Sequence, residues 1–252
     1  MRILSIHAHP DDAEILAGGT LALLGAHHEI TVVTMTAGDC GSDDLGPDEI
    51  SAIRRAEAAA AAAVIDADYL CAEFRDMAIF NDDPSRRRVT EILRQLRPQA
   101  VLTSSPIDYH PDHEATSILV RDACFAASCP NYITDSESPA DPLAAIPHLY
   151  FMDAVEGKDR DGKEQRPDFY VNIETAFATK RKMLACHSSQ RDWLRRQHNI
   201  DEYLETMEVW TRAIGRRCGV LYAEGFRRYP GHPYPQSPLL EQALEGHIVR
   251  RV

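Results

Sequence analysis

Two short runs of histidine and aspartate indicate where this chain performs chemistry. Residues 8–14 read Ala-His-Pro-Asp-Asp-Ala-Glu and directly follow an apolar run. Residues 109–113 read Tyr-His-Pro-Asp-His and follow a second apolar run much later in the chain. Imidazole and carboxylate groups are common ligands for a catalytic divalent metal that keeps one position open for water. We therefore interpret the two runs as halves of a single metal site.

His9, Asp12 and His113 form the predicted ligand set. The spacing from His9 to Asp12 lets both side chains turn toward one point across a strand-to-helix turn. His113 must then reach the same point from the second run. Two histidines and one carboxylate are a standard ligand set for a catalytic divalent metal, and the same set can also hold Fe²⁺.

Three polar side chains of the same runs remain free for other roles. Asp11 is adjacent to a predicted ligand, so it is the expected general base that takes a proton from the metal-bound water. His110 is expected to stabilise an oxyanion or to protonate a leaving amine. Asp112 is expected to hold one of the histidines in the right tautomer, close to the metal but not bound to it.

Simpler interpretations exist for each run taken alone. Asp11 and Asp12 could cap a helix, and each His-Pro-Asp triplet could be an ordinary turn with a surface histidine. Two such triplets, each after a predicted strand, are harder to explain as unrelated turns. His7 is interpreted as a core histidine rather than as a fourth ligand.

The elements that carry these runs alternate between strand and helix. Apolar and β-branched runs predict strands, and each is followed by a helical pattern. The expected strands are 2–6, 29–36, 68–74 and 100–104, and the expected helices are 15–24, 51–64, 85–96 and 114–127. This alternation predicts a Rossmann-like, doubly wound α/β fold with a mainly parallel sheet and helices on both faces. The first and fourth strands are neighbours in the common strand order of such folds, which would bring the two runs together.

The second half of the chain is less regular. We expect residues 1–127 to form the core βα repeats, and residues 128–252 to add further elements within a single domain spanning 1–252. These are a proline-containing excursion at 129–147, two strands at 149–154 and 169–173, two helices at 176–186 and 203–217, and a proline-rich tail at 229–252. The early Gly18-Gly19 pair suggests that the first helix packs closely against another element.

Composition narrows the classes of partner. The 252 residues carry a net charge of -12, which argues against nucleic acid or an anionic membrane as the main partner. No apolar run approaches the roughly 20 residues of a membrane span, and no signal peptide is expected, which favours the cytoplasm. The six cysteines form no C-x-x-C pair, so reduced thiols without a metal role are expected. The sequence is compatible with a homo-oligomer.

At these motifs the sequence resembles the LmbE-like, or PIG-L, family of deacetylases. The two His-Pro-Asp runs and Gly18-Gly19-Thr20 carry the resemblance, supported more weakly by residues 54–57 (Arg-Arg-Ala-Glu) and 187–190 (His-Ser-Ser-Gln). The resemblance implies a Rossmann-like fold and zinc-dependent removal of acetyl groups from N-acetylglucosamine-type sugars. It also implies the metal ligands, base and oxyanion partner named above, and it places Arg54 near the substrate and Asp76 on the sugar side.

The leading hypothesis is therefore hydrolysis of an N-acetyl group on an amino-sugar conjugate, a small-molecule substrate. A non-haem Fe(II) oxygenase would use the same two-histidine, one-carboxylate set, but those enzymes are usually built on β-barrels. A non-catalytic, metal-stabilised sugar-binding module is the third hypothesis. A nucleotide-binding domain is disfavoured because the first turn lacks G-x-G-x-x-G.

Overall fold

A single mixed sheet organises the fold, which a computed structural model describes for residues 1–198 and 203–250. Within these ranges the sheet has eight strands in the order β3-β2-β1-β4-β5-β7-β6-β8. The strands are β1 (Arg2–His7), β2 (Glu29–Thr36), β3 (Asp68–Phe74), β4 (Ala100–Thr103), β5 (His148–Met152), β6 (Phe169–Asn172), β7 (Ala223–Arg228) and β8 (Ile248–Val249). The five strands β1–β5 pair in parallel, and β6, β7 and β8 are antiparallel to their neighbours.

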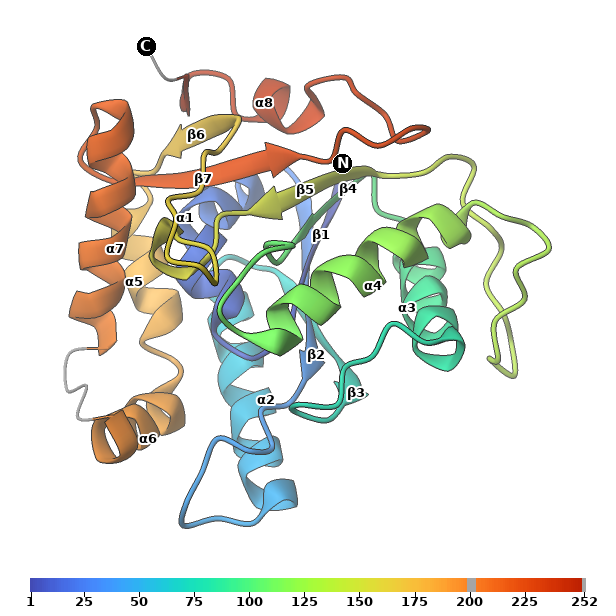
Figure 1. The fold of residues 1–252 in the computed structure, drawn as a ribbon, viewed down its shortest axis with the longest axis horizontal. Coiled ribbons are helices and arrows are strands. Elements are labelled where there is room, and N and C mark those ends of the chain that lie inside the picture. The colour runs from blue at the N-terminus through green and yellow to red at the C-terminus, as the bar shows by residue number, and fades with distance from the viewer. Residues whose placement is uncertain (199–202, 251–252) are drawn as a thin grey trace.

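Helices cover both faces of the sheet (Figure 1). They are α1 (Asp12–Gly25), α2 (Pro47–Ala63), α3 (Asp83–Leu96), α4 (Pro111–Ala127), α5 (Phe177–Leu184), α6 (Ser188–His198), α7 (Tyr203–Cys218) and α8 (Leu239–Ala243), with a short 3₁₀ turn η1 (Val155–Gly157). The predicted doubly wound α/β class is confirmed. No helix in the described ranges combines the length and apolar character needed to cross a membrane.

Alternating side chains of β1 divide the core into two layers. Ile3 packs in one cluster with α1, α2 and α5, whereas Leu4 and Ile6 pack in the other with α3 and α4. Successive strand residues point to opposite faces, so a run of apolar residues is needed when both faces are covered. This explains why apolar residues occupy both faces of β1, with Ile3 on one face and Leu4 and Ile6 on the other.

The predicted close approach at Gly18-Gly19 is confirmed. Both glycines lie within the continuous helix α1. A Cβ at Gly19 would lie 2.5 Å from Ile173 Cδ1, and one at Gly18 would lie 3.2 Å from Lys180 Cγ. Glu224 of β7 accepts hydrogen bonds from the backbone N–H groups of Gly19 and Thr20 at 2.9 and 2.7 Å.

Several elements of the second half differ from the sequence prediction. The strands expected at 149–154 and 169–173 are β5 and β6, but they are not neighbours, because β7 lies between them. Strand β7, helix α6, helix α8 and strand β8 were not predicted as separate elements. The tail expected through residue 252 contains α8 and β8, and its residues 251–252 lie outside the described ranges. The six cysteines, all within the described ranges, are not paired in disulfides.

Candidate active site

The turn after β1 presents two carboxylates that do not cap the following helix. Asp11 occupies the N-cap position of α1 with φ 96° and ψ -22°, and its side chain makes no capping hydrogen bond. Asp12 accepts a hydrogen bond from the backbone N–H of His9 at 2.9 Å. A left-handed conformation is uncommon at residues other than glycine, although aspartate adopts it more readily than most. The capping interpretation therefore does not explain this turn.

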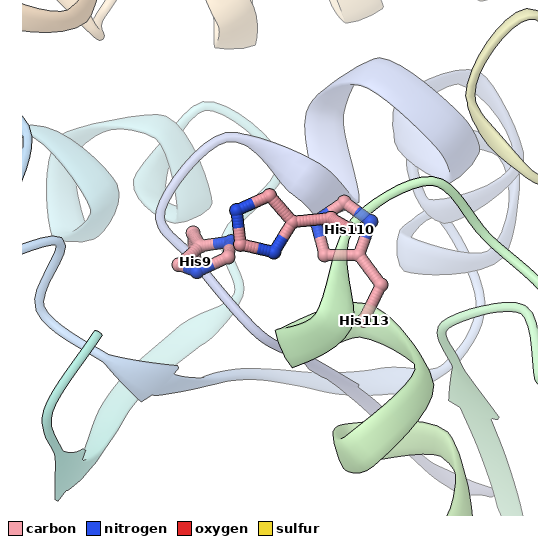
Figure 2. Close-up of side chains that lie close together, drawn as sticks. All are labelled: His9, His110 and His113. Carbon is pink, nitrogen blue, oxygen red and sulfur yellow. The ribbon is translucent and has the colours of Figure 1, made fainter. Parts of the chain in front are cut away.

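The turn after β4 supplies the second half. Strand β4 pairs with β1 in parallel, with Ile6 opposite Thr103, so both turns leave the same edge of the sheet. His110 is the N-cap of α4, and its Nδ1 accepts a hydrogen bond from the backbone N–H of Asp112 at 3.2 Å. Figure 2 shows His9 meeting His110 and His113 at the start of α4. The prediction that the first and fourth strands are neighbours is confirmed, and it is what joins the two motifs.

The three predicted ligands lie together. Asp12 Oδ2 is 3.6 Å from His9 Nδ1, and Asp12 Oδ1 is 3.2 Å from His113 Nε2. Ligands at about 2.1 Å from a tetrahedral zinc ion are separated by roughly 3.4 Å. Each of these two distances is close to that value, but they involve different oxygens of Asp12. The ring nitrogens of His9, His110 and His113 also lie within 4.8 Å of one another. The geometry thus brings the candidates together without choosing among the histidines, and the ligand set stays a prediction.

Charge at the site favours a cation. Burial lowers the pKa of His9, but hydrogen bonds with Asp112 and Asp12 outweigh it and raise the pKa to about 9. Burial also lowers the pKa of His113, but the interactions with Asp12 and Asp108 outweigh burial and raise the pKa to about 10. The pKa of Asp12 lies well below its ordinary value, because the two histidines outweigh its burial. Buried carboxylates that hold protons on neighbouring histidines would hold a divalent metal in the same way.

The Asp11 carboxylate is buried beside the predicted ligands. The Tyr203 hydroxyl, from the first residue of α7, donates a short hydrogen bond to its carboxylate. Burial raises the pKa of Asp11, and Arg54 is the largest influence in the opposite direction. Tyr203 was missed by the sequence analysis, because no local pattern links residues that lie so far apart in the chain.

Arg54 and Asp76 both reach the site. Arg54 of α2 is buried, and its guanidinium donates to the carbonyl oxygens of Pro10 and Gly38 at 3.0 and 3.4 Å. A Cβ at Gly38 would overlap this guanidinium, which explains a glycine at that position. Asp76 accepts hydrogen bonds from the Thr36 hydroxyl at 2.5 Å and from a backbone N–H at 2.9 Å, and it lies 3.9 Å from His9 Nε2.

Two carboxylates hold the histidine rings. Asp112 Oδ2 is 3.1 Å from His9 Nε2 and accepts the backbone N–H of Met77 at 2.8 Å, and its orienting role stays a prediction. Asp108 Oδ1 lies 3.1 Å from His113 Nδ1. Asp108 was missed, although its position in the loop between β4 and the second motif could have suggested it.

The two weaker motifs of the sequence meet in space. Glu57 of α2 accepts hydrogen bonds from the Ser188 hydroxyl at 2.8 Å and from the Ser189 N–H and hydroxyl at 2.9 and 2.5 Å. A carboxylate at this place satisfies free N–H groups at the start of α6. His187, the residue before them, is buried with Nε2 3.6 Å from Glu14 Oε2. These motifs therefore fix where α6 lies relative to α1 and α2.

A cavity of about 550 Å³ opens onto these groups. Its lining includes every predicted catalytic, metal and substrate residue, and Asp112 lies outside it in contact with His9. Its described lining residues are His9, Asp11, Asp12, Ile15, Cys40, Gly41, Arg54, Asp76, Met77, Tyr109, His110, His113, Val155, Gln190, Trp193, Leu194, Tyr203, Thr206, Met207 and Trp210. A cavity of this size accommodates a small-molecule substrate.

Comparison with known proteins identifies relatives that are similar over most of the chain. The PIG-L family profile, described as GlcNAc-PI de-N-acetylase, matches residues 4–124. The diacetylchitobiose deacetylase of Thermococcus kodakarensis is 26% identical over 244 residues, covering 91% of this chain and 84% of the relative. The 4-oxalmesaconate hydratase of Pseudomonas putida is 26% identical over 196 residues, covering 74% and 73%.

A solved structure extends the likeness to three dimensions. The N,N'-diacetylchitobiose deacetylase from Pyrococcus horikoshii superposes with a TM-score of 0.78 at 27% identity, covering 94% of this chain and 88% of that one. Both motifs that form the cavity lie within the part of the chain that the family profile matches. Residues 4–124, which carry both motifs, therefore match the PIG-L, or LmbE-like, family, and most of the chain is similar to deacetylases in sequence and fold.

Proposed function

We propose that this protein is a metal-dependent N-deacetylase that hydrolyses the N-acetyl group of an N-acetylglucosamine-type sugar conjugate. One observation carries the proposal: the buried Asp11 carboxylate lies beside Asp12, yet neither side chain caps α1. A carboxylate with a raised pKa next to a metal-binding cluster is suited to proton transfer. The deacetylase relatives described above support the same reaction class.

His9, Asp12 and His113 would hold the metal, with Zn²⁺ favoured by this donor set and Fe²⁺ as the alternative. When bound, such an ion polarises the amide carbonyl and lowers the pKa of water toward about 7. Asp11 accepts the proton of the attacking water and later returns it to the departing amine. The Tyr203 hydroxyl keeps the Asp11 carboxylate in place for both transfers.

His110 is placed to stabilise the oxyanion. Burial, with His9 and His113, lowers the pKa of His110, so the ring is neutral at neutral pH. Its Nδ1 already accepts the Asp112 N–H, so the neutral ring carries its proton on Nε2. That N–H is the donor available to a negative oxygen developing on the substrate carbonyl. Asp76 and Arg54, which line the same cavity, would contact the sugar.

The hydratase relative raises a second reaction on the same fold. The named substrate of that relative carries carboxylate groups, which need cationic partners. Arg54 is the only lysine or arginine among the described residues that line the cavity, and Asp11, Asp12 and Asp76 line it as well. The scarcity of lysine and arginine in the described lining favours a neutral amide substrate over a polyanion.

Two variants test the assignment. Asp11→Asn should keep the bound metal but lower kcat/KM for acetate release by about 10²-fold or more, because the base is removed and little else changes. His113→Ala should lose both metal and turnover. Asp161→Asn, in an exposed turn, is the control and should match the parent enzyme. Unchanged metal content in His113→Ala would refute the ligand assignment, and full activity in Asp11→Asn would refute the role of Asp11.

A further inference from the structure

One part of the cavity wall is apolar and contributes none of the groups used in the reaction. Both tryptophans of the chain lie there, Trp193 on α6 and Trp210 on α7. The other apolar side chains of this wall are Ile15, Val155, Leu194 and Met207. We call these six residues the apolar wall. Removal of an acetyl group from a free monosaccharide requires no surface of this size.

The apolar wall offers few hydrogen-bonding partners. Gln190 and Thr206 are the polar side chains that α6 and the adjoining part of α7 add to the described lining, apart from Tyr203. The Gln190 Oε1 atom is buried without a hydrogen-bond partner in the described structure, so it can accept one bond from a ligand. A second sugar ring carries several hydroxyls that would need partners on burial. The wall therefore suits an apolar group that carries at most one polar contact.

The apolar wall itself offers nothing to bind an anionic group. Arg54, the one lysine or arginine in the described lining, already donates to Pro10 O and Gly38 O and is not part of the wall. None of the six residues of the wall carries a charge, so a phosphate buried against them would lack a cationic partner there. A neutral substituent avoids this cost.

Contacts at the starts of α6 and α7 fix the position of the apolar wall relative to the proposed catalytic groups. Helix α6 is fixed at its start by the Glu57 contacts with Ser188 and Ser189, one helical turn from Arg54 on α2. Helix α7 is fixed at its start by the hydrogen bond from Tyr203 to Asp11. A substituent on the wall would therefore help to position the N-acetyl group relative to the base.

We propose that the apolar wall is a subsite for a neutral, apolar aglycone, alkyl or aryl, attached to the amino sugar. The inference rests on the deacetylase function proposed above and goes further by naming the class of conjugate. Binding energy gained on the wall lowers KM and, through positioning, supports turnover.

A glycoside series on the metal-loaded enzyme tests the subsite through acetate release. The probes are methyl, hexyl and phenyl glycosides of N-acetylglucosamine as both anomers, N-acetylglucosamine 1-phosphate, and N,N'-diacetylchitobiose. We expect kcat/KM for the hexyl or the phenyl glycoside to exceed that for the methyl glycoside by at least about tenfold. The comparison of hexyl with phenyl separates alkyl from aryl aglycones. The phosphate should be the poorest substrate.

Two variants locate the effect. Trp210→Leu should bring the hexyl-to-methyl and phenyl-to-methyl ratios of kcat/KM toward one. Val209→Ala is the matched control, because Val209 is the adjacent residue of α7, is 59% exposed and lies outside the lining. It should leave both ratios unchanged. If Trp210→Leu does not fold, the comparison of glycosides on the wild-type enzyme still tests the proposed subsite.

The outcomes separate the two proposals. Acetate release at similar kcat/KM from the methyl, hexyl and phenyl glycosides would overturn the subsite and leave the deacetylase function intact. A preference for the phosphate or for the disaccharide over both apolar glycosides would also overturn it. Absence of acetate from every probe, including the methyl glycoside, would overturn the proposed function, and the aglycone subsite with it.

Discussion

Asp153 is a buried carboxylate that we expect to weaken the fold at neutral pH. It follows β5 directly, is 3% exposed, and neither carboxylate oxygen has a hydrogen-bond partner in the described structure. Burial raises the pKa of Asp153 from 3.8 to about 6, although Arg227 and Arg217 pull it in the opposite direction. The Arg217 Nη1 atom lies 3.9 Å away, too far for a hydrogen bond. The charged form is therefore less stable inside the protein than in water.

The size and sign of the effect follow from this pKa. The difference between 3.8 and about 6 corresponds to about 3 kcal/mol of unfolding free energy. Below pH 3.8, the pKa in the unfolded state, the carboxyl is neutral in both the folded and the unfolded protein and does not lower the stability. Between the two values only the folded state holds the proton, so the contribution of Asp153 to stability falls as pH rises. Above about pH 6 the full penalty applies.

Asp153→Asn removes the charge while keeping the shape. The variant should be more stable than the parent by up to about 3 kcal/mol at about pH 8, with the gain vanishing at about pH 4. Urea unfolding at equilibrium, followed by circular dichroism across this pH range, measures the difference. Asp161→Asn, whose side chain is 64% exposed, is the matched control and should stay within about 0.5 kcal/mol of the parent.

The opposite result would refute the reasoning. If Asp153→Asn were less stable than the parent at about pH 8, Asp153 would be a favourable partner of Arg217 and Arg227. Its pKa would then lie below 3.8, and the stability difference would grow as pH rises through that value.

Three further changes test other parts of the molecule. Lys180→Met should cost about 3–5 kcal/mol by urea unfolding, because the Glu224 carboxylate, 2.6 Å from Lys180 Nζ, would stay buried without its cation; a loss below about 1 kcal/mol would contradict this. Gly19→Ala should cost about 1–3 kcal/mol by the same measurement, since its Cβ would overlap the facing isoleucine, whereas Gly46→Ala, with nothing within 4 Å, should cost less. Tyr203→Phe should lower kcat by about tenfold with little change in KM or metal content, because the proposed general base loses a hydrogen-bond donor; an unchanged kcat would show that the hydroxyl is not needed.

The sequence by itself determined the repeating part of the fold and the location of the chemistry. Apolar and β-branched runs alternating with helical patterns are local signals, so strands β1–β4 and helices α1–α4 were predicted close to their observed bounds. The helices at both motifs begin earlier than predicted, at Asp12 and Pro111, because the motif residues themselves form the first turns. The adjacency of β1 and β4 followed from the common strand order of doubly wound sheets, and it placed His9 near His113 before any coordinates.

Only the tertiary structure decided how the second half of the chain completes the site. Strand β7 was missed because Gly225, Arg227 and Arg228 give its short sequence a weak strand pattern, and its place between β5 and β6 depends on pairing across the sheet. The contact of Tyr203 with Asp11 and the apolar wall of α6 and α7 bring together residues that no local pattern connects. Helix and turn signals act over a few residues, whereas contacts between distant segments are selected by packing and by the burial of charge. The residues of the two motifs were therefore readable in the sequence as a candidate site, and the cavity that surrounds them was not.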